Sequence, residues 1–139
     1  MKKMILTAVC ILGIYAASQA QETQKLKVNV PNVSSTEGVV IVSLFNSEET
    51  FLKDAYKEVN EKAVSGEMKF SFEDVPVGEY TICVIHDLNK NGELDTNFIG
   101  MPTEPYGISM QGKNSYSPPT YSKAVFKVEK RDHTITVKL

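Results

Sequence analysis

Apolar and polar residues alternate along most of this chain, with the period of two residues that is typical of half-buried β-strands. In the first such segment, Leu26, Val28 and Val30 fall on one face. Strands are predicted over residues 25–33, 38–47, 67–72, 79–87, 123–130 and 133–139. Short strands separated by turn residues indicate a mostly β protein, folded as a single antiparallel β-sandwich.

Two of the predicted strands are apolar on both faces, so neither of their faces suits contact with solvent. Residues 39–45 and 80–86 therefore need a covering element. Residues 46–64 predict one, a short amphipathic helix with Ser47 as its cap and acidic residues in its first turn. The apolar side chains on one side of this helix are Phe51, Leu52, Ala55, Tyr56 and Val59.

A long segment, residues 100–122, interrupts the strand pattern with four prolines, three glycines and three tyrosines. A connection of this length inside a compact domain is usually functional or disordered, and this composition predicts an ordered surface loop. It either forms a ledge for a ligand or partner, or it fills a sheet edge. The candidate binding residues of the ledge are Glu104, Tyr106, Tyr116 and Tyr121.

The first twenty residues follow the plan of a secretory signal peptide. Lys2 and Lys3 precede an apolar run over residues 4–17, and Ser18 and Ala20 are the small residues before a cut. The apolar run is too short to span a bilayer in the usual way, although an N-terminal membrane anchor is the alternative.

Cleavage of this leader divides the chain into residues 1–20, a short linker at 21–25 and one β-sandwich domain at 26–139. The exported domain is expected in the periplasm or outside the cell. Without Lys2 and Lys3 it carries 13 basic and 17 acidic side chains, a formal charge of −4. This balance argues against nucleic acid or an anionic membrane as a partner, and no other stretch is able to span a membrane.

The exported domain keeps one cysteine, Cys83, which cannot form an internal disulfide. It lies within the apolar strand predicted at residues 79–87. A nucleophilic thiol needs an exposed, electropositive setting, so a buried and inert Cys83 is expected.

The polar loop at residues 87–95 carries oxygen-bearing side chains at alternate positions, with Gly92 at the bend. This spacing matches the start of an EF-hand calcium loop, because a tight loop turns every second side chain inward. Asp95 falls at the ninth position, which often binds calcium through water. The candidate calcium ligands are Asp87, Asn89, Asn91, Glu93 (through its carbonyl) and Asp95.

The calcium pattern is incomplete at its end, because Phe98 stands where the twelfth position takes a bidentate Glu. Water or a remote carboxylate such as Glu104 then has to complete the shell, and the expected affinity is weak, in the ~10⁻⁴–10⁻³ M range. The alternative is a plain turn in which Asn89 and Asn91 cap backbone groups and Gly92 takes a positive φ.

The stretch from Phe72 to Ser109 resembles the signature of a bacterial family, domain of unknown function 2141. The matching positions are Pro76, Gly78, Tyr80, His86, Asp87, Asn89, Asn91, Gly92, Asp95, Thr96, Asn97, Gly100, Pro102, Glu104, Gly107 and Ser109. The resemblance extends over about residues 26–139. It implies a secreted or envelope protein without an assigned activity, similar in fold to immunoglobulin-like, transthyretin-like and carboxypeptidase-regulatory sandwiches, and it implies no catalytic residue.

A binding or structural module fits these features better than an enzyme does. The expected module binds calcium weakly at residues 87–95 and a protein or glycan through residues 100–122. The alternative is a small secreted hydrolase in which His86 works with Asp87 or Glu104 as an acid–base pair.

Overall fold

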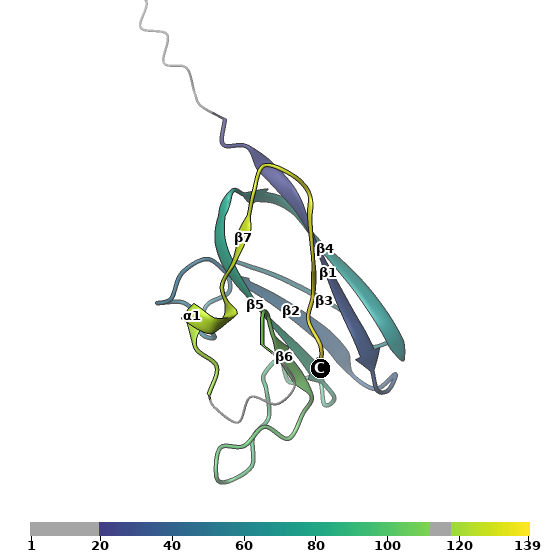
Figure 1. The fold of residues 1–139 in the computed structure, drawn as a ribbon. Coiled ribbons are helices and arrows are strands. Elements are labelled where there is room, and N and C mark those ends of the chain that lie inside the picture. Colours follow the sequence, from purple (N-terminus) through teal and green to yellow (C-terminus); the bar gives the residue numbers. More distant parts are fainter. Residues whose placement is uncertain (1–19, 112–117) are drawn as a thin grey trace, which may run out of the picture.

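The structure, a computed structural model, describes residues 20–111 and 118–139. The predicted leader, apart from its last residue, and Tyr116 therefore lie outside the described residues. Two packed β-sheets make up the fold, as predicted, with one short helix beside them (Figure 1). The elements are β1 (Thr23–Val33), β2 (Val39–Phe45), β3 (Lys57–Lys62), β4 (Gly66–Pro76), β5 (Gly78–Asp87), β6 (Tyr106–Ile108), α1 (Tyr121–Ala124), β7 (Phe126–Val128) and β8 (His133–Thr136).

The two sheets differ in how their strands pair. One sheet has the order β4-β1-β8, and the other has the order β3-β2-β5-β6, with β7 paired to the first residues of β5. β1 and β8 run parallel to each other, with Leu26 opposite His133, so the predicted purely antiparallel arrangement is corrected at this pair. The strand β1 also begins at Thr23, inside the segment predicted as a linker.

A hydrophobic core lies between the sheets. Leu26, Val28 and Val30 of β1 are fully buried, which confirms the face that the alternation predicts. They share one cluster with Val42 of β2 and Val84 of β5, so both sheets contribute to the same core.

A second, smaller cluster covers the other face of β2 and β5. It joins Phe45, Cys83, Ile108 and Ala124, with Phe51 packed against it. The predicted cover on this face is therefore present. It is built from the turn that carries Phe51 and from α1, instead of one amphipathic helix, and Ile108 of the neighbouring strand β6 contributes to the same cluster.

The predicted helix over residues 46–64 is wrong. The Ser47 hydroxyl does accept a hydrogen bond from the Thr50 N–H at 3.3 Å, but the chain continues only as a turn, and Leu52 has a φ of 58°, outside the helical region. Residues Lys57–Lys62 then form β3, which pairs with the edge of β2. Four of the six side chains of β3 are charged, which suits an edge strand, since charge protects an open edge from further pairing.

The two ends of the sandwich carry different parts of the chain (Figure 1). The first described residues enter at one end, at the top of the view. The segment after β5, drawn in green, extends beyond both sheets at the opposite end. Among the described residues, no helix is long and apolar enough to cross a membrane.

Candidate functional site

The segment that extends beyond the sheets, residues 87–104, is referred to here as the display loop. It begins where β5 ends, at the fully buried Asp87. The Asp87 carboxylate accepts hydrogen bonds from the Asn91 N–H at 3.2 Å and the Gly92 N–H at 2.8 Å. A Cβ atom at Gly38 would lie 2.0 Å from the Asp87 carbonyl oxygen, so only glycine allows β2 to begin this close to the loop. Asp87 therefore shapes the turn from a fixed position.

Asp95 is the point on which the polar side chains of the turn converge. The Asn91 amide donates to its carboxylate at 2.7 Å, and the Asn89 amide donates to its other oxygen. Glu93 contributes no side-chain contact, but its N–H donates to the Asn91 Oδ1 at 3.0 Å. The structure thus draws the side chains of Asn89, Asn91 and Asp95 together above the turn that Asp87 holds.

Glu104 closes the base of the display loop. Its carboxylate is 7% exposed and accepts hydrogen bonds from the Leu88 N–H at 2.8 Å and the Asp95 N–H at 3.0 Å. It therefore ties together two backbone positions seven residues apart. The structure brings Glu104 to the predicted calcium loop, although the sequence separates it from Asp95 by nine positions.

The display loop holds more acidic than basic side chains, and among the described residues none of its carboxylates forms an ion pair. Asp87, Asp95 and Glu104 all lie in it, while the ion pairs of residues 20–111 and 118–139 lie elsewhere, at Glu22, Glu73 and Glu129. Across these same residues, no three His, Cys, Asp or Glu side chains are placed as a group that could hold a metal. A calcium ion here would therefore depend on amide and backbone oxygens as well as on carboxylates.

The tip of the display loop, residues 96–103, is apolar and exposed. Phe98 is 99% exposed, Ile99 68% and Met101 58%. Asn97 holds the tip in shape, because its Oδ1 accepts hydrogen bonds from the N–H groups of Ile99 at 3.1 Å and Met101 at 3.0 Å. At the base of the tip, Thr96 forms an isolated β-bridge with Pro102.

The candidate acid–base residues are not paired with one another. The fully buried His86 places its Nε2 2.7 Å from the Glu37 carbonyl oxygen, while its Nδ1 has no hydrogen-bond partner among residues 20–111 and 118–139. Asp87 and Glu104 are both occupied by backbone N–H groups. This arrangement offers no exposed acid–base pair.

The predicted tyrosine ledge is only partly described, because Tyr116 lies outside the described residues. Tyr106 is partly buried and packs against the second cluster. The Tyr121 ring packs edge-on against Phe51, with centroids 5.9 Å apart, and burial raises the pKa of its hydroxyl. The structure therefore uses these two tyrosines in packing.

The family-motif residues that follow the display loop stabilise the β-sandwich next to it. The buried Ser109 hydroxyl donates to the Ala124 carbonyl at 2.7 Å and accepts from the Ile82 N–H at 2.9 Å, which ties α1 to β5. A Cβ atom at Gly107 would lie 2.1 Å from the Lys138 carbonyl oxygen. These residues position the loop and do not form part of its surface.

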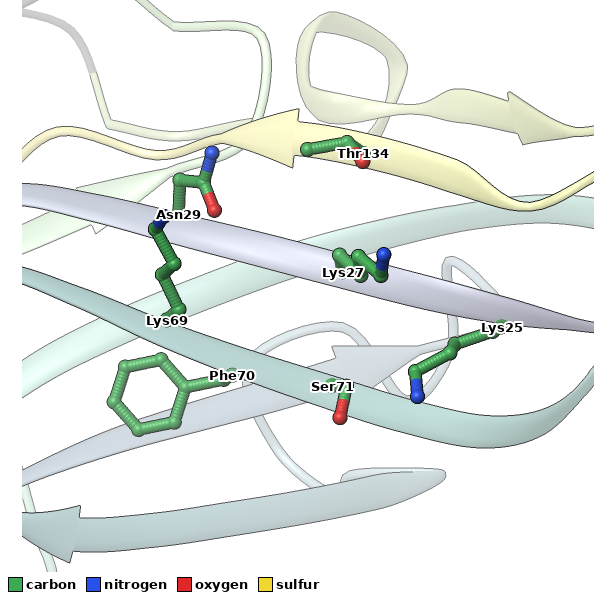
Figure 2. Close-up of a pocket in the computed structure, with 7 residues that line it drawn as sticks. All are labelled: Lys25, Lys27, Asn29, Lys69, Phe70, Ser71 and Thr134. Atoms are coloured by element: carbon green, nitrogen blue, oxygen red, sulfur yellow. The ribbon is translucent and has the colours of Figure 1, made fainter.

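A separate basic surface, the lysine groove, lies on the outer face of the three-stranded sheet (Figure 2). Lys69 extends from β4 toward Asn29, its partner on β1, and Lys25 pairs with Glu73 at 2.8 Å. The groove encloses about 450 Å³ and is lined by Lys25, Lys27, Asn29, Lys69, Phe70, Ser71 and Thr134. Its open, polar chemistry is typical of the solvated face of a sheet.

Sequence reasoning missed the exposed tip. In the sequence, Phe98 was noted only because it occupies the position where a complete calcium loop has a Glu ligand. The available signal was the eight-residue stretch 96–103, which has no charged side chain and places Phe98, Ile99 and Met101 between polar neighbours. Composition alone does not separate a buried apolar run from an exposed one, because both carry the same residues.

Comparison with known proteins gives one family. A family model described as an uncharacterized protein conserved in bacteria (DUF2141) matches residues 28–136. No curated protein and no solved structure gives a match. The match spans both sheets and the whole display loop.

Proposed function

This chain belongs to the DUF2141 family, and we propose that it is an exported, non-catalytic binding module whose display loop is stabilised by calcium. The observation that carries the calcium proposal is the gathering of Asp87, Asp95 and Glu104 without a cationic side chain in ion-pair contact among the described residues. A divalent cation supplies the charge that such a loop lacks.

The calcium ligands proposed are Asp87, Asn89, Asn91, Glu93 (through its carbonyl) and Asp95. Asn89 and Asn91 already direct their amide groups at the Asp95 carboxylate. A half-turn of each amide would present its oxygen there, and it would break the hydrogen bonds that the two Oδ1 atoms accept from the N–H groups of Asn91 and Glu93. Only two of these ligands carry full charge, so the affinity is in the ~10⁻⁴–10⁻³ M range of extracellular modules. Calcium then acts by fixing the shape of the loop.

Thermal melting of residues 21–139 tests the calcium proposal. We expect about 10 mM calcium to raise the melting temperature by about 5 °C relative to chelator, because a ligand that binds only the folded state stabilises it. Asp95→Asn should abolish the shift. Glu93→Gln is the matched control: it removes the same charge but keeps the backbone carbonyl, so the shift should persist. Identical melting curves for the unaltered protein in calcium and in chelator would sink the proposal.

The binding surface proposed is the display loop itself, with its apolar tip. A protein or glycan partner was expected at residues 100–122, and the tip contributes residues 100–103 of that segment. The likeness to transthyretin-like and carboxypeptidase-regulatory sandwiches belongs to the same proposal. Its support is the turn at residues 76–80, in which the Tyr80 hydroxyl donates to the Pro76 carbonyl at 2.8 Å.

The competing proposal is a small hydrolase that uses His86 with Asp87 or Glu104. It requires these buried groups to leave their backbone partners, whereas the binding module uses them where they lie. Substrate turnover that is lost in Glu104→Gln, while the protein stays folded by circular dichroism, would revive the enzyme.

A further inference from the structure

The tip of the display loop exposes its largest side chains in an unusual way. The Phe98 ring is 99% exposed, so it makes almost no contact with its own chain. Ile99 and Met101 beside it are also more than half exposed. Contiguous apolar side chains on the surface of a soluble domain usually mark a contact with a partner or a membrane.

Charge is absent from the tip and returns at its base. Residues 96–103 contain no acidic, basic or histidine side chain. The exposed charges of the loop are Lys90, Glu93 and the partly exposed Asp95, and all three fall outside residues 96–103. Their net charge is negative, which disfavours an anionic surface as the partner and is compatible with a zwitterionic one.

Several N–H groups of the tip are hydrogen-bonded within the tip. The Asn97 N–H donates to the Met101 carbonyl at 2.8 Å, and the Gly100 N–H donates to the Asn97 carbonyl at 3.0 Å. The N–H groups of Ile99 and Met101 both donate to the Asn97 side chain. These four N–H groups are therefore already paired if the tip enters an apolar layer, where an unpaired N–H group is costly.

We propose that this tip is a lipid anchor, which inserts Phe98, Ile99 and Met101 into the interfacial layer of a zwitterionic bilayer. Lipid surrounds a protruding ring on all sides, whereas a protein surface without a matching pocket covers only one side. The insertion is shallow, because the charged base of the loop stays at the level of the headgroups. The inference rests on the proposed function for the role of the display loop as the binding surface, and it does not depend on calcium.

A single tryptophan reports on the anchor directly, because the natural chain has none. In residues 21–139 carrying Phe98→Trp, we expect phosphatidylcholine vesicles to shift the tryptophan emission to shorter wavelength. Brominated phosphatidylcholine should quench it. The matched control is Val64→Trp, at a position that is 57% exposed and outside the loop, and its emission should not change.

Vesicle co-sedimentation measures what the tip contributes. Replacing the apolar group, as in Phe98→Ser with Ile99→Ser, should lower the vesicle-bound fraction about tenfold or more, whereas Val64→Ser with Val77→Ser should leave it unchanged. Circular dichroism establishes that each variant is folded. Absence of vesicle binding by the unaltered protein at millimolar lipid overturns the anchor. So does self-association in analytical ultracentrifugation that Phe98→Ser abolishes, since the tip then serves a second copy.

The same variants separate this inference from the calcium proposal. Phe98→Ser leaves every proposed calcium ligand in place, so its calcium-dependent melting shift without lipid should equal that of the unaltered protein. Loss of vesicle binding with an intact calcium shift assigns the lipid contact to the tip. An intact calcium shift without vesicle binding by the unaltered protein rejects the anchor alone.

Discussion

The lysine groove and the display loop are both exposed, but the groove presents polar and charged side chains to water, whereas the tip of the loop presents apolar ones. The groove presents Lys27, Lys69 and hydroxyl groups, which water solvates well, on a regular sheet. The loop presents Phe98 and Ile99 on irregular backbone, part of which is held by hydrogen bonds to the Asn97 side chain. Exposure alone is therefore a poor sign of function, whereas apolar exposure on a well-bonded loop calls for a partner.

The largest expected difference is in the free energy of unfolding, when one carboxylate is removed at the display loop and one beside the lysine groove. Glu104→Ala leaves the partly buried N–H groups of Leu88 and Asp95 without their acceptor, so the free energy of unfolding should fall by ~2–4 kcal/mol. Glu73→Ala breaks the exposed pair with Lys25 and should cost less than ~1 kcal/mol. Urea titration measures both values, and equal losses would contradict the comparison.

Cys83 provides a reference that lies in neither region. Burial raises the pKa of its thiol to about 12, above the ordinary 9.0. Above pH 9 the unfolded chain therefore releases this proton and the folded chain keeps it, so stability falls as the pH rises, by at most ~1.4 kcal/mol per unit from this group. Urea titrations at pH 9 and 10 measure the slope, and Cys83→Ala should remove this part of it. The native thiol should also resist modification at pH 8, and rapid modification would show that the second cluster opens.

Asn97→Ala tests whether hydrogen bonding makes the tip rigid. It removes the acceptor for the N–H groups of Ile99 and Met101, so the hydrogen exchange of these two amides should become about fivefold faster. The control is Asn29→Ala in the lysine groove, which should leave tip exchange unchanged. Nuclear magnetic resonance measures both. Unchanged exchange in Asn97→Ala would mean that the tip is held by something other than this side chain.

The smallest effect is expected in the groove itself. Lys27→Ala combined with Lys69→Ala removes two solvated charges, and the free energy of unfolding should change by less than ~0.5 kcal/mol. Phosphatidylcholine vesicle binding should also stay the same. A marked loss of vesicle binding in this variant would move the lipid contact from the loop to the groove.

The regular part of the fold was predictable because burial on one face leaves a clear alternation. Leu26, Val28 and Val30 show this alternation. The strand around Cys83 is apolar on both faces, which predicted that its second face would also be covered. The turn residues of the display loop were also predictable as a polar bend, since Asp87 and Gly92 have strong local preferences. Gly92 indeed takes a φ of 81°.

The errors have physical causes. Phe51, Leu52 and Tyr56 have helical spacing, but Phe51 packs on the second cluster, while Leu52 and Tyr56 are 43% and 40% exposed. Edge strand β3 gave little signal, because charged side chains replace the alternation at an open edge. The role of Glu104 in closing the loop base was also hidden, because it depends on a turn that returns the chain to Leu88.

If the chain is exported as proposed, the placement of the display loop opposite to the first described residues would set the order of events during export. The strand β5 alone spans roughly 33 Å, at about 3.3 Å for each of its ten residues. A chain still held at the translocation site by an uncut leader would point Phe98 away from that bilayer. Cleavage, followed by tumbling through half a rotation, would therefore have to come before docking on the same membrane, whereas a facing membrane could be reached from the tethered state.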